Sequence, residues 1–114
     1  MFWKTKSKES KGSVGTFKIL APEEYKKAIA KGGTQLVDVR TAREYKSGYI
    51  ANAINIDLFR PGHFRTKFEQ LDKNKPVYLY CRSGQRSRKA AAKLLKLGFS
   101  ELYDLEGGIL NWLE

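Results

Sequence analysis

Thiols and imidazoles are scarce in this sequence of 114 residues. Cys81 is its one cysteine and His63 its one histidine. A single cysteine excludes an internal disulfide and a zinc site built from several thiolates. A single histidine excludes any site that needs two imidazoles, and a catalytic cysteine–histidine pair would have to use His63.

Long apolar runs are also absent. No run approaches the roughly 20 apolar residues that a membrane-spanning helix needs. The beginning of the chain is rich in Lys, Ser and Gly and lacks the apolar segment of a secretory signal. We therefore expect a basic N-terminal tail over residues 1–15 and one domain over residues 16–114. The lone thiol and the missing signal favour the cytoplasm, which is a reducing compartment.

Acidic residues are outnumbered by basic ones. The chain has 12 Asp and Glu against 22 Lys and Arg, which gives a net charge of +10. Such a balance points to an anionic partner, which could be nucleic acid, a membrane surface or a small anion. Apolar residues make up 41% of the chain, enough for a folded core, so we do not expect global disorder.

Short apolar segments alternate with segments of helical periodicity. This alternation predicts an α/β fold with a mostly parallel central sheet and helices on both faces. Strands are expected at residues 17–20, 36–39, 53–56, 77–80 and 101–103. Helices are expected from Pro22, from Thr41 with Glu44 in a capping box, over residues 63–71, and from the mid-80s to Gly98, with a last helical turn at residues 109–112.

The segment after the fourth expected strand carries the chemistry. Cys81 follows this strand directly, and the loop behind it opens a helix. Ligands gather outside the carboxyl ends of parallel strands, and a helix N-terminus presents unpaired N–H groups that stabilise an anion. Six basic residues and no acidic one lie between Cys81 and Ser100, namely Arg82, Arg86, Arg88, Lys89, Lys93 and Lys96. The pattern indicates a reactive thiolate in an anion-binding loop.

A lone cysteine in a small domain is more often an apolar filler of the core. The residues after Cys81 are Arg82, Ser83, Gly84, Gln85 and Arg86. They are polar, and Gly84 permits a tight turn of the backbone. This local sequence favours a nucleophile over a core residue.

Three segments resemble those of single-domain rhodaneses, a family of sulfurtransferases. The run from Cys81 to Ser87 resembles the short active-site loop of the family, residues 37–56 its first motif, and residues 105–109 with Trp112 its closing motif. The resemblance covers residues 16–114 and implies that the α/β fold is rhodanese-like. Tyr49 stands where the family usually has His, and Asn52 where it usually has Gly.

The resemblance also implies a two-step transfer of sulfane sulfur. A Cys81 persulfide would form from thiosulfate or a persulfide donor and pass its sulfur to cyanide, a thiol or a partner protein. The substrate-binding residues would be Arg82, Ser83, Gly84, Gln85 and Arg86. The implied partners are a small anionic sulfur donor and a thiol or protein acceptor. We expect no metal, cofactor, membrane span or specific nucleic acid. The chain would be a monomer or weak dimer.

Two other classes of function stay open. Cysteine-dependent phosphatases and arsenate reductases place five residues between Cys and Arg, whereas four separate Cys81 from Arg86. The smaller ring suits one sulfur atom better than a tetrahedral oxyanion. A non-catalytic basic binding module is the second alternative, although no aromatic residues are interleaved with the scattered lysines to stack bases.

Two charged positions near the expected site carry weaker predictions. Asp38 could hold the active-site edge of the sheet in place, but a structural ion pair of Glu44 with Arg40 or Arg43 is the more frequent arrangement for such residues. His63 could border the donor entrance, although an exposed residue is the more frequent case.

Overall fold

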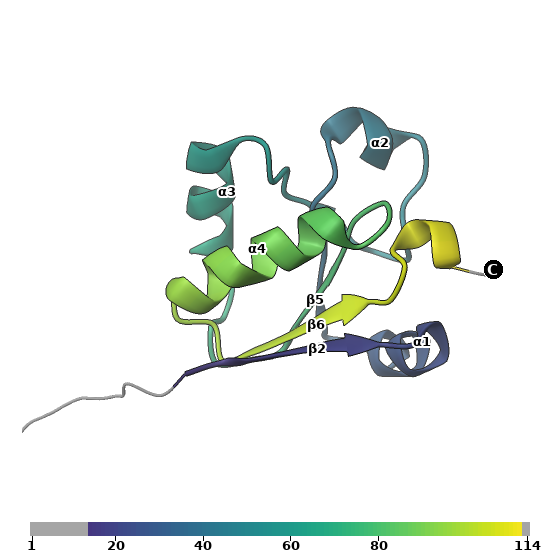
Figure 1. Ribbon diagram of the computed structural model, residues 1–114, viewed down its shortest axis with the longest axis horizontal. Coiled ribbons are helices and arrows are strands. Elements are labelled where there is room, and N and C mark those ends of the chain that lie inside the picture. Colours follow the sequence, from purple (N-terminus) through teal and green to yellow (C-terminus); the bar gives the residue numbers. More distant parts are fainter. Residues whose placement is uncertain (1–13, 113–114) are drawn as a thin grey trace, which may run out of the picture.

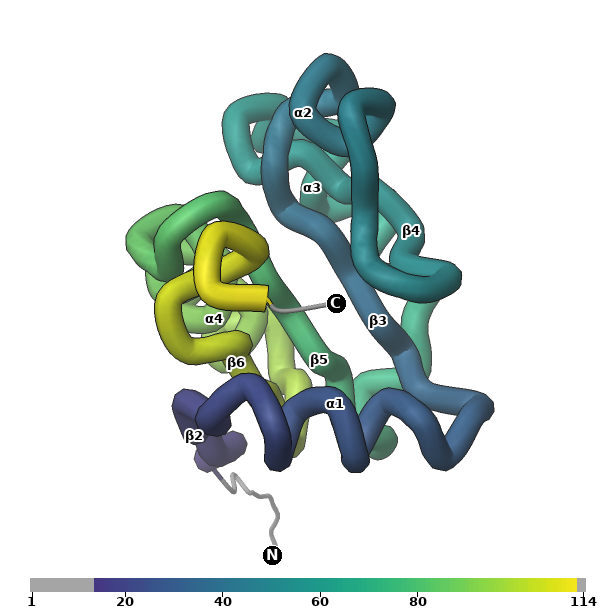
Figure 2. Tube along the Cα trace, turned by 90° about the vertical axis from the view of Figure 1, so that its right-hand side faces the viewer, coloured from purple at the N-terminus to yellow at the C-terminus, as the bar shows by residue number. Residues whose placement is uncertain are grey.

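The computed structural model describes residues 14–112 and shows one five-stranded sheet. Its strand order is β2-β6-β5-β3-β4, and all four pairings are parallel. The strands are β2 (Thr16–Leu20), β3 (Gln35–Asp38), β4 (Ile54–Asn55), β5 (Val77–Tyr80) and β6 (Glu101–Leu105). The order can be followed in Figure 2 from β2 on the left to β4 on the right. The predicted α/β class with a parallel sheet is confirmed. Most of the predicted tail lies outside the described residues.

The helices cover both faces of this sheet (Figure 1). They are α1 (Pro22–Ala30), α2 (Ala42–Lys46), α3 (Pro61–Phe68) and α4 (Gln85–Lys96), followed by the 3-10 helix η1 (Ile109–Asn111). Phe64 and Phe68 of α3 and Leu94 of α4 pack in one apolar cluster on one face. Tyr25 of α1 belongs to a second cluster, to which Ile109 and Trp112 also pack. The sheet is therefore a middle layer between two cores.

Local sequence signals explain where the helices begin. Pro22 occupies the first position of α1, where the missing N–H costs nothing. The capping box predicted for α2 is present, because the Thr41 hydroxyl accepts from the Glu44 N–H and the Glu44 carboxylate accepts from the Thr41 N–H. In α4 the buried Ala90, Ala91 and Leu94 form one face of the helix. No helix within residues 14–112 has the length and apolar character needed to cross a membrane.

The central strand β5 positions the predicted loop. On one side β5 pairs with β3, and Asp38 at the carboxyl end of β3 is in register with Tyr80. On the other side β5 pairs with β6. Strand β6 is longer than predicted and ends at Leu105 rather than at Tyr103. The extension brings Asp104 into the sheet, in register with Leu79 of β5.

Candidate active site

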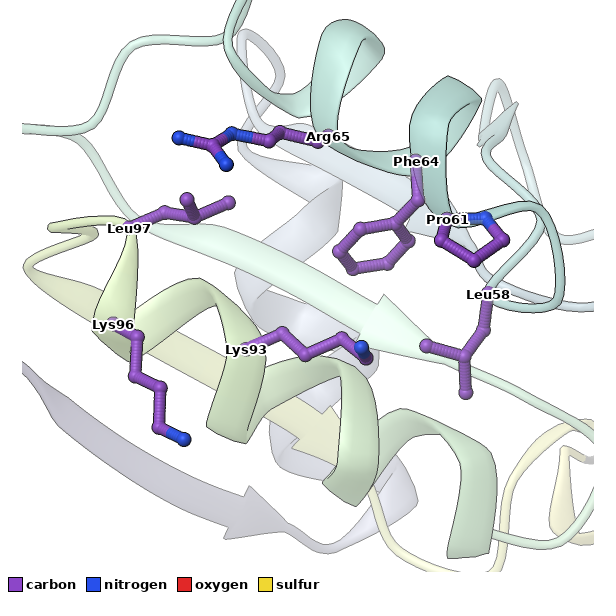
Figure 3. A pocket seen from close by; sticks show the side chains of 7 residues that line it. All are labelled: Leu58, Pro61, Phe64, Arg65, Lys93, Lys96 and Leu97. Atoms are coloured by element: carbon purple, nitrogen blue, oxygen red, sulfur yellow. The ribbon is translucent and has the colours of Figure 1, made fainter.

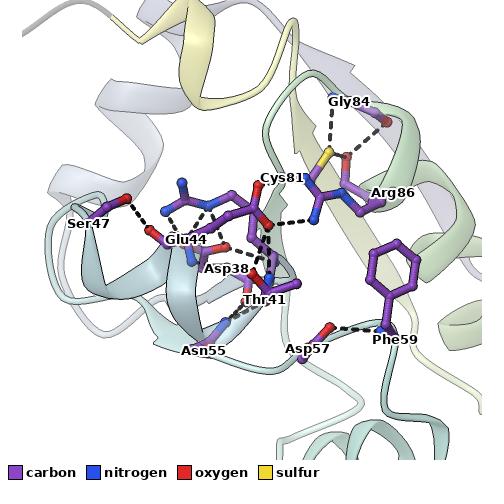
Figure 4. A network of polar contacts seen from close by, with 12 residues as sticks. Asp38, Thr41, Glu44, Ser47, Asn55, Asp57, Phe59, Cys81, Gly84 and Arg86 are labelled. Atoms are coloured by element: carbon purple, nitrogen blue, oxygen red, sulfur yellow. Dashed lines mark hydrogen bonds and ion pairs between the residues drawn. The ribbon is translucent and has the colours of Figure 1, made fainter.

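Cys81 is the first residue after β5, and its side chain is directed at the loop that follows. The Gly84 N–H donates to Cys81 Sγ at 2.9 Å, and Ser87 Oγ lies 3.4 Å from the same sulfur. Figure 4 shows Gly84 and Arg86 next to Cys81. The residue is 1% exposed and belongs to the apolar cluster between the sheet, α3 and α4. The sulfur is thus buried like that of a core cysteine, but a backbone N–H and a hydroxyl group lie next to it.

The turn that brings the Gly84 N–H to Cys81 Sγ depends on the glycine at position 84. Its φ of +110° lies in a region that residues with a side chain rarely adopt, and it forms the N-cap of α4. The N–H groups in the first turn of a helix have no intrahelical acceptor. Those of Gln85, Arg86 and Ser87 therefore lie at the positive end of the α4 dipole.

The loop that follows β6 contacts the loop that follows Cys81. The Ile109 N–H donates to the Cys81 carbonyl at 2.9 Å, and the Leu110 N–H donates to the Arg82 carbonyl at 3.1 Å. Gly108, at a φ of +67°, allows this approach, because a Cβ atom there would lie 2.3 Å from the Arg82 carbonyl oxygen. The closing motif of the sequence is thus in direct contact with the active-site loop.

Arg86 is held by Glu44 at the mouth of the site. Its two terminal nitrogens donate to the two carboxylate oxygens at 2.6 and 2.9 Å (Figure 4). The bond to Arg86 is the largest cause that lowers the pKa of Glu44 to about 2, and it also raises the pKa of Arg86. The guanidinium lies 5.6 Å from the centre of the exposed Phe59 ring. The pair therefore stays charged over the whole neutral range.

The expectation that Glu44 pairs with Arg40 or Arg43 was wrong. Arg40 instead forms a buried ion pair with Asp38 at 2.7 Å and donates to the Gly48 carbonyl. The reason is the turn after β3, which folds the Arg40 side chain back onto a carboxylate two residues earlier. Arg40 thereby joins Asp38, at the end of β3, to the loop after α2.

The predicted loop residues differ in exposure. Arg82, Ser83 and Gln85 are exposed, Arg86 is partly buried, and Cys81 and Gly84 are buried. His63 lies in α3 and is partly exposed. Among residues 14–112 no group of three His, Cys, Asp or Glu side chains is placed to hold a metal ion.

Ser87 is the last residue of the predicted active-site loop but was given no role, and Asp104 was not singled out from the sequence. The Ser87 hydroxyl donates to the Gly84 carbonyl at 3.1 Å in addition to its contact with Cys81 Sγ. Asp104 is a buried carboxylate on β6. A signal for Ser87 was available, because it lies in the first turn of the new helix, from which a side chain can turn back to the thiol.

A separate hollow of about 370 Å³ lies between α3 and α4 (Figure 3). It is lined by Leu58, Pro61, Phe64, Arg65, Lys93, Lys96 and Leu97. Neither Cys81 nor residues 82–86 line it, so the predicted site is not part of this hollow. The site around Cys81 is instead a tight loop that closes around the sulfur.

Comparison with known proteins relates most of the chain to one family. The model of the Rhodanese-like domain matches residues 21–114. The uncharacterized protein YqhL of Bacillus subtilis is 39% identical over 95 residues, which cover 83% of this chain and 71% of that protein. A tRNA uridine(34) hydroxylase of Acinetobacter baumannii is 38% identical over 99 residues, which cover 83% of this chain. The match spans 31% of that hydroxylase, about a third of its length.

Solved structures show the same fold. A rhodanese-like domain protein from Staphylococcus aureus superposes with a TM-score of 0.74 at 31% identity, covering 85% of this chain and 92% of that one. The human single-domain sulfurtransferase TSTD1 superposes with a TM-score of 0.69 at 22% identity, covering 82% and 93%. The second likeness concerns the fold alone.

Proposed function

Because the chain belongs to the rhodanese-like domain family, we propose that it is a sulfurtransferase that moves sulfane sulfur through a persulfide on Cys81. One observation carries the proposal: the Gly84 N–H donates to Cys81 Sγ at 2.9 Å inside a loop that opens α4. A backbone donor aimed at sulfur favours the thiolate and any negative charge that forms next to it.

The proposed first step forms one S–S bond and breaks another. The Cys81 thiolate attacks the outer sulfur of thiosulfate, and sulfite leaves with the electron pair of the broken bond. The product is a persulfide anion on Cys81. In the second step a nucleophile such as cyanide or a thiolate attacks the outer sulfur, and the Cys81 thiolate leaves. Charge and electrons balance in both steps, so neither an oxidant nor a cofactor is needed.

The loop residues have separate roles in this proposal. The first-turn N–H groups at residues 85–87 stabilise the negative outer sulfur. The exposed Arg82 attracts the dianionic donor. Arg86 is already bound to Glu44, so its main effect is to fix the loop against α2, and its charge toward a donor is largely offset. Ser83 and Gln85 lie exposed at the entrance, where the donor arrives.

Sulfur transfer is favoured over phosphate chemistry by the size of the site. Cys81 is almost fully buried, and the loop returns to the core at Ser87. Arg86 lies one position earlier than the arginine of a phosphatase loop, and it is bound to Glu44. One sulfur atom at the end of a slim donor fits this arrangement better than a tetrahedral group.

The substrates and setting of the protein are part of the same proposal. The donor is a small sulfur anion, and the acceptor is a thiol or a partner protein, with no specific nucleic acid involved. A monomer or weak dimer in the reducing cytoplasm suits a nucleophilic thiol. The hydroxylases share about a third of their length with this chain, so their activity on tRNA is not extended to it.

Intact-mass measurement tests the proposal directly. Thiosulfate should add the mass of one sulfur atom to the protein, and cyanide should remove it with formation of thiocyanate. Cys81→Ser should acquire no adduct. If neither thiosulfate nor a small persulfide adds sulfur to the folded protein, the proposal is wrong. Turnover of a phosphate ester that depends on Cys81 would favour the phosphatase alternative.

A further inference from the structure

The hollow between α3 and α4 combines an apolar lining with basic side chains (Figure 3). Its volume of about 370 Å³ lies in the range of pockets that hold small molecules. Leu58 and Phe64, which are 6% and 3% exposed, form the apolar lining together with the partly buried Leu97. Arg65 from α3 and Lys93 from α4 are exposed and line the hollow from the two facing helices. No acidic side chain belongs to the lining.

Neighbouring acids offset little of this positive charge. Within the part of the chain that the structure describes, no carboxylate lies within 4.0 Å of the Lys93 or Lys96 nitrogen. Arg65 Nε lies 4.0 Å from a carboxylate oxygen of Glu69, but Lys73 binds that carboxylate more closely, at 2.7 Å. The hollow therefore attracts anions.

The hollows along α1 differ in charge. Glu23 and Lys26 line two of them together, so a negative charge offsets part of the positive charge. A third is lined by Lys26 with Ile29 and Trp112 and has a single basic residue. Three basic residues without an acid therefore distinguish the hollow between α3 and α4 from these three.

Lys93 can contact both an apolar and a charged part of one ligand. In Figure 3 its side chain extends toward Leu58 below the Phe64 ring. The methylene groups of a lysine can continue an apolar wall while its ammonium group stays in water. An inorganic anion would leave the apolar lining exposed to water, and a neutral hydrocarbon would leave the charges without a partner. A molecule with both parts matches the whole lining.

We propose that this hollow is a second binding site, which takes a small organic anion with an apolar body, such as a medium-chain carboxylate. The apolar body lies against Leu58, Phe64 and Leu97, and the acid group lies near Lys93 and Arg65. Neither the thiol nor the loop that follows it lines the hollow, so binding requires no sulfur transfer.

Three other occupants fit the charge or the lining less well. Residues 1–13 include the apolar Phe2 and Trp3, but they also have four Lys against one Glu and are repelled by the basic lining. A second copy of the chain has a net charge of +10 and is repelled in the same way. The backbone of a nucleic acid supplies anions but no apolar body for the lining.

The experiment titrates sodium octanoate into the full chain and follows the backbone amide signals by NMR. The signals of Leu58, Phe64 and Lys93 should shift most. Butyrate has the same charge but four fewer CH₂ groups, and octanamide has the same chain without the charge. Octanoate should bind at least tenfold more tightly than butyrate, because each fully buried CH₂ group strengthens binding about fourfold. It should bind about two- to fivefold more tightly than octanamide, the effect of one exposed ion pair.

Substitutions assign the charge effect to the hollow. Lys93→Gln should weaken octanoate binding about two- to fivefold. Lys27→Gln removes an exposed lysine from α1 on the other face of the sheet and should leave the affinity unchanged. If Lys93→Gln disturbs the fold, Arg65→Gln on the facing helix provides the same test. Cys81→Ser should bind octanoate like the wild type, so the result does not depend on the proposed sulfur transfer.

Several outcomes would overturn the proposal. They are equal affinities for octanoate and octanamide, equal effects of Lys93→Gln and Lys27→Gln, and amide shifts confined to another surface. Tighter binding of an acidic peptide with a central phenylalanine than of octanoate would assign the hollow to a partner protein. A dimer in sedimentation equilibrium that Lys93→Gln dissociates would assign it to a second copy of the chain.

Discussion

The Arg86 guanidinium binds both oxygens of the Glu44 carboxylate, although 42 positions separate the two residues. Glu44 is also the third residue of α2 and closes its capping box. One carboxylate thus completes the N-terminus of α2 and fixes the first turn of α4 beside Cys81. The pair connects the segments that follow two neighbouring strands, β3 and β5.

Glu44→Gln should lower the stability of the fold by about 1 kcal/mol at neutral pH, because solvent partly screens this partly exposed pair. The pKa of Glu44 is about 2, below its ordinary value of 4.5. Its contribution is therefore present above pH 4.5 and is lost as the pH falls toward 2. Urea unfolding at several pH values measures the loss. The difference between wild type and Glu44→Gln should shrink across this acidic window.

Glu69→Gln is the matched control for that experiment. Glu69 also pairs with a basic residue, Lys73, but on the exposed surface of the molecule. Its removal should change the urea midpoint less than the removal of Glu44. Equal losses of stability for the two variants would show that the ion pair between α2 and α4 stabilises the fold no more than an ion pair on the surface does.

Local signals predicted the elements of this fold, because they act within a few residues. Pro22 and the Thr41–Glu44 capping box begin helices where the sequence indicated. The Glu44–Arg86 pair could not be predicted in the same way, since it depends on which strands are neighbours. Both residues follow the carboxyl ends of strands, so a parallel sheet places them on one edge, but the sequence leaves the strand order open.

Asp104 shows a second limit of the sequence pattern. The last strand was predicted over residues 101–103. The strand continues to Leu105 because its pairings with β2 and β5 persist through this position. The neighbouring strands and α4 therefore bury Asp104, and nothing in the adjacent sequence indicates this burial.

Asp104→Asn should stabilise the protein above pH 6 by about 1–3 kcal/mol, the cost of a buried charge without partners. The pKa of Asp104 is raised from its ordinary 3.8 to about 6, so between these values the folded protein holds a proton there that the unfolded chain has lost. Wild-type stability should accordingly fall as the pH rises from about 4 to 6. Thermal unfolding of the wild type and of Asp104→Asn across this pH range checks the prediction. A gain from Asp104→Asn that persists at pH 3 would point to packing instead of charge.

Arg82→Gln should raise the KM for thiosulfate about two- to fivefold with little change in kcat, the size expected for one exposed charge acting on a dianion. Arg82 is exposed at the entrance to the loop. The effect should diminish as salt is added, because added ions screen exposed charges. Lys96→Gln removes the same charge from the far end of α4 and serves as the control. Equal changes in KM for both variants would assign the effect to net charge rather than to the site.

Gly108→Ala should disturb the active-site loop as well as the stability of the fold. A Cβ atom at this position would lie 2.3 Å from the Arg82 carbonyl oxygen and 2.7 Å from that of Cys81, so one of the two loops must move. Gly33 has nearly the same φ, +68° against +67°, but a Cβ atom there would meet no other atom within 4 Å. Gly33→Ala therefore carries only the backbone strain, about 1–2 kcal/mol. Gly108→Ala should lose more stability in urea unfolding and should also change the alkylation rate of Cys81, which Gly33→Ala should leave intact. Identical behaviour of the two variants in both measurements would mean that the closing loop does not support the thiol.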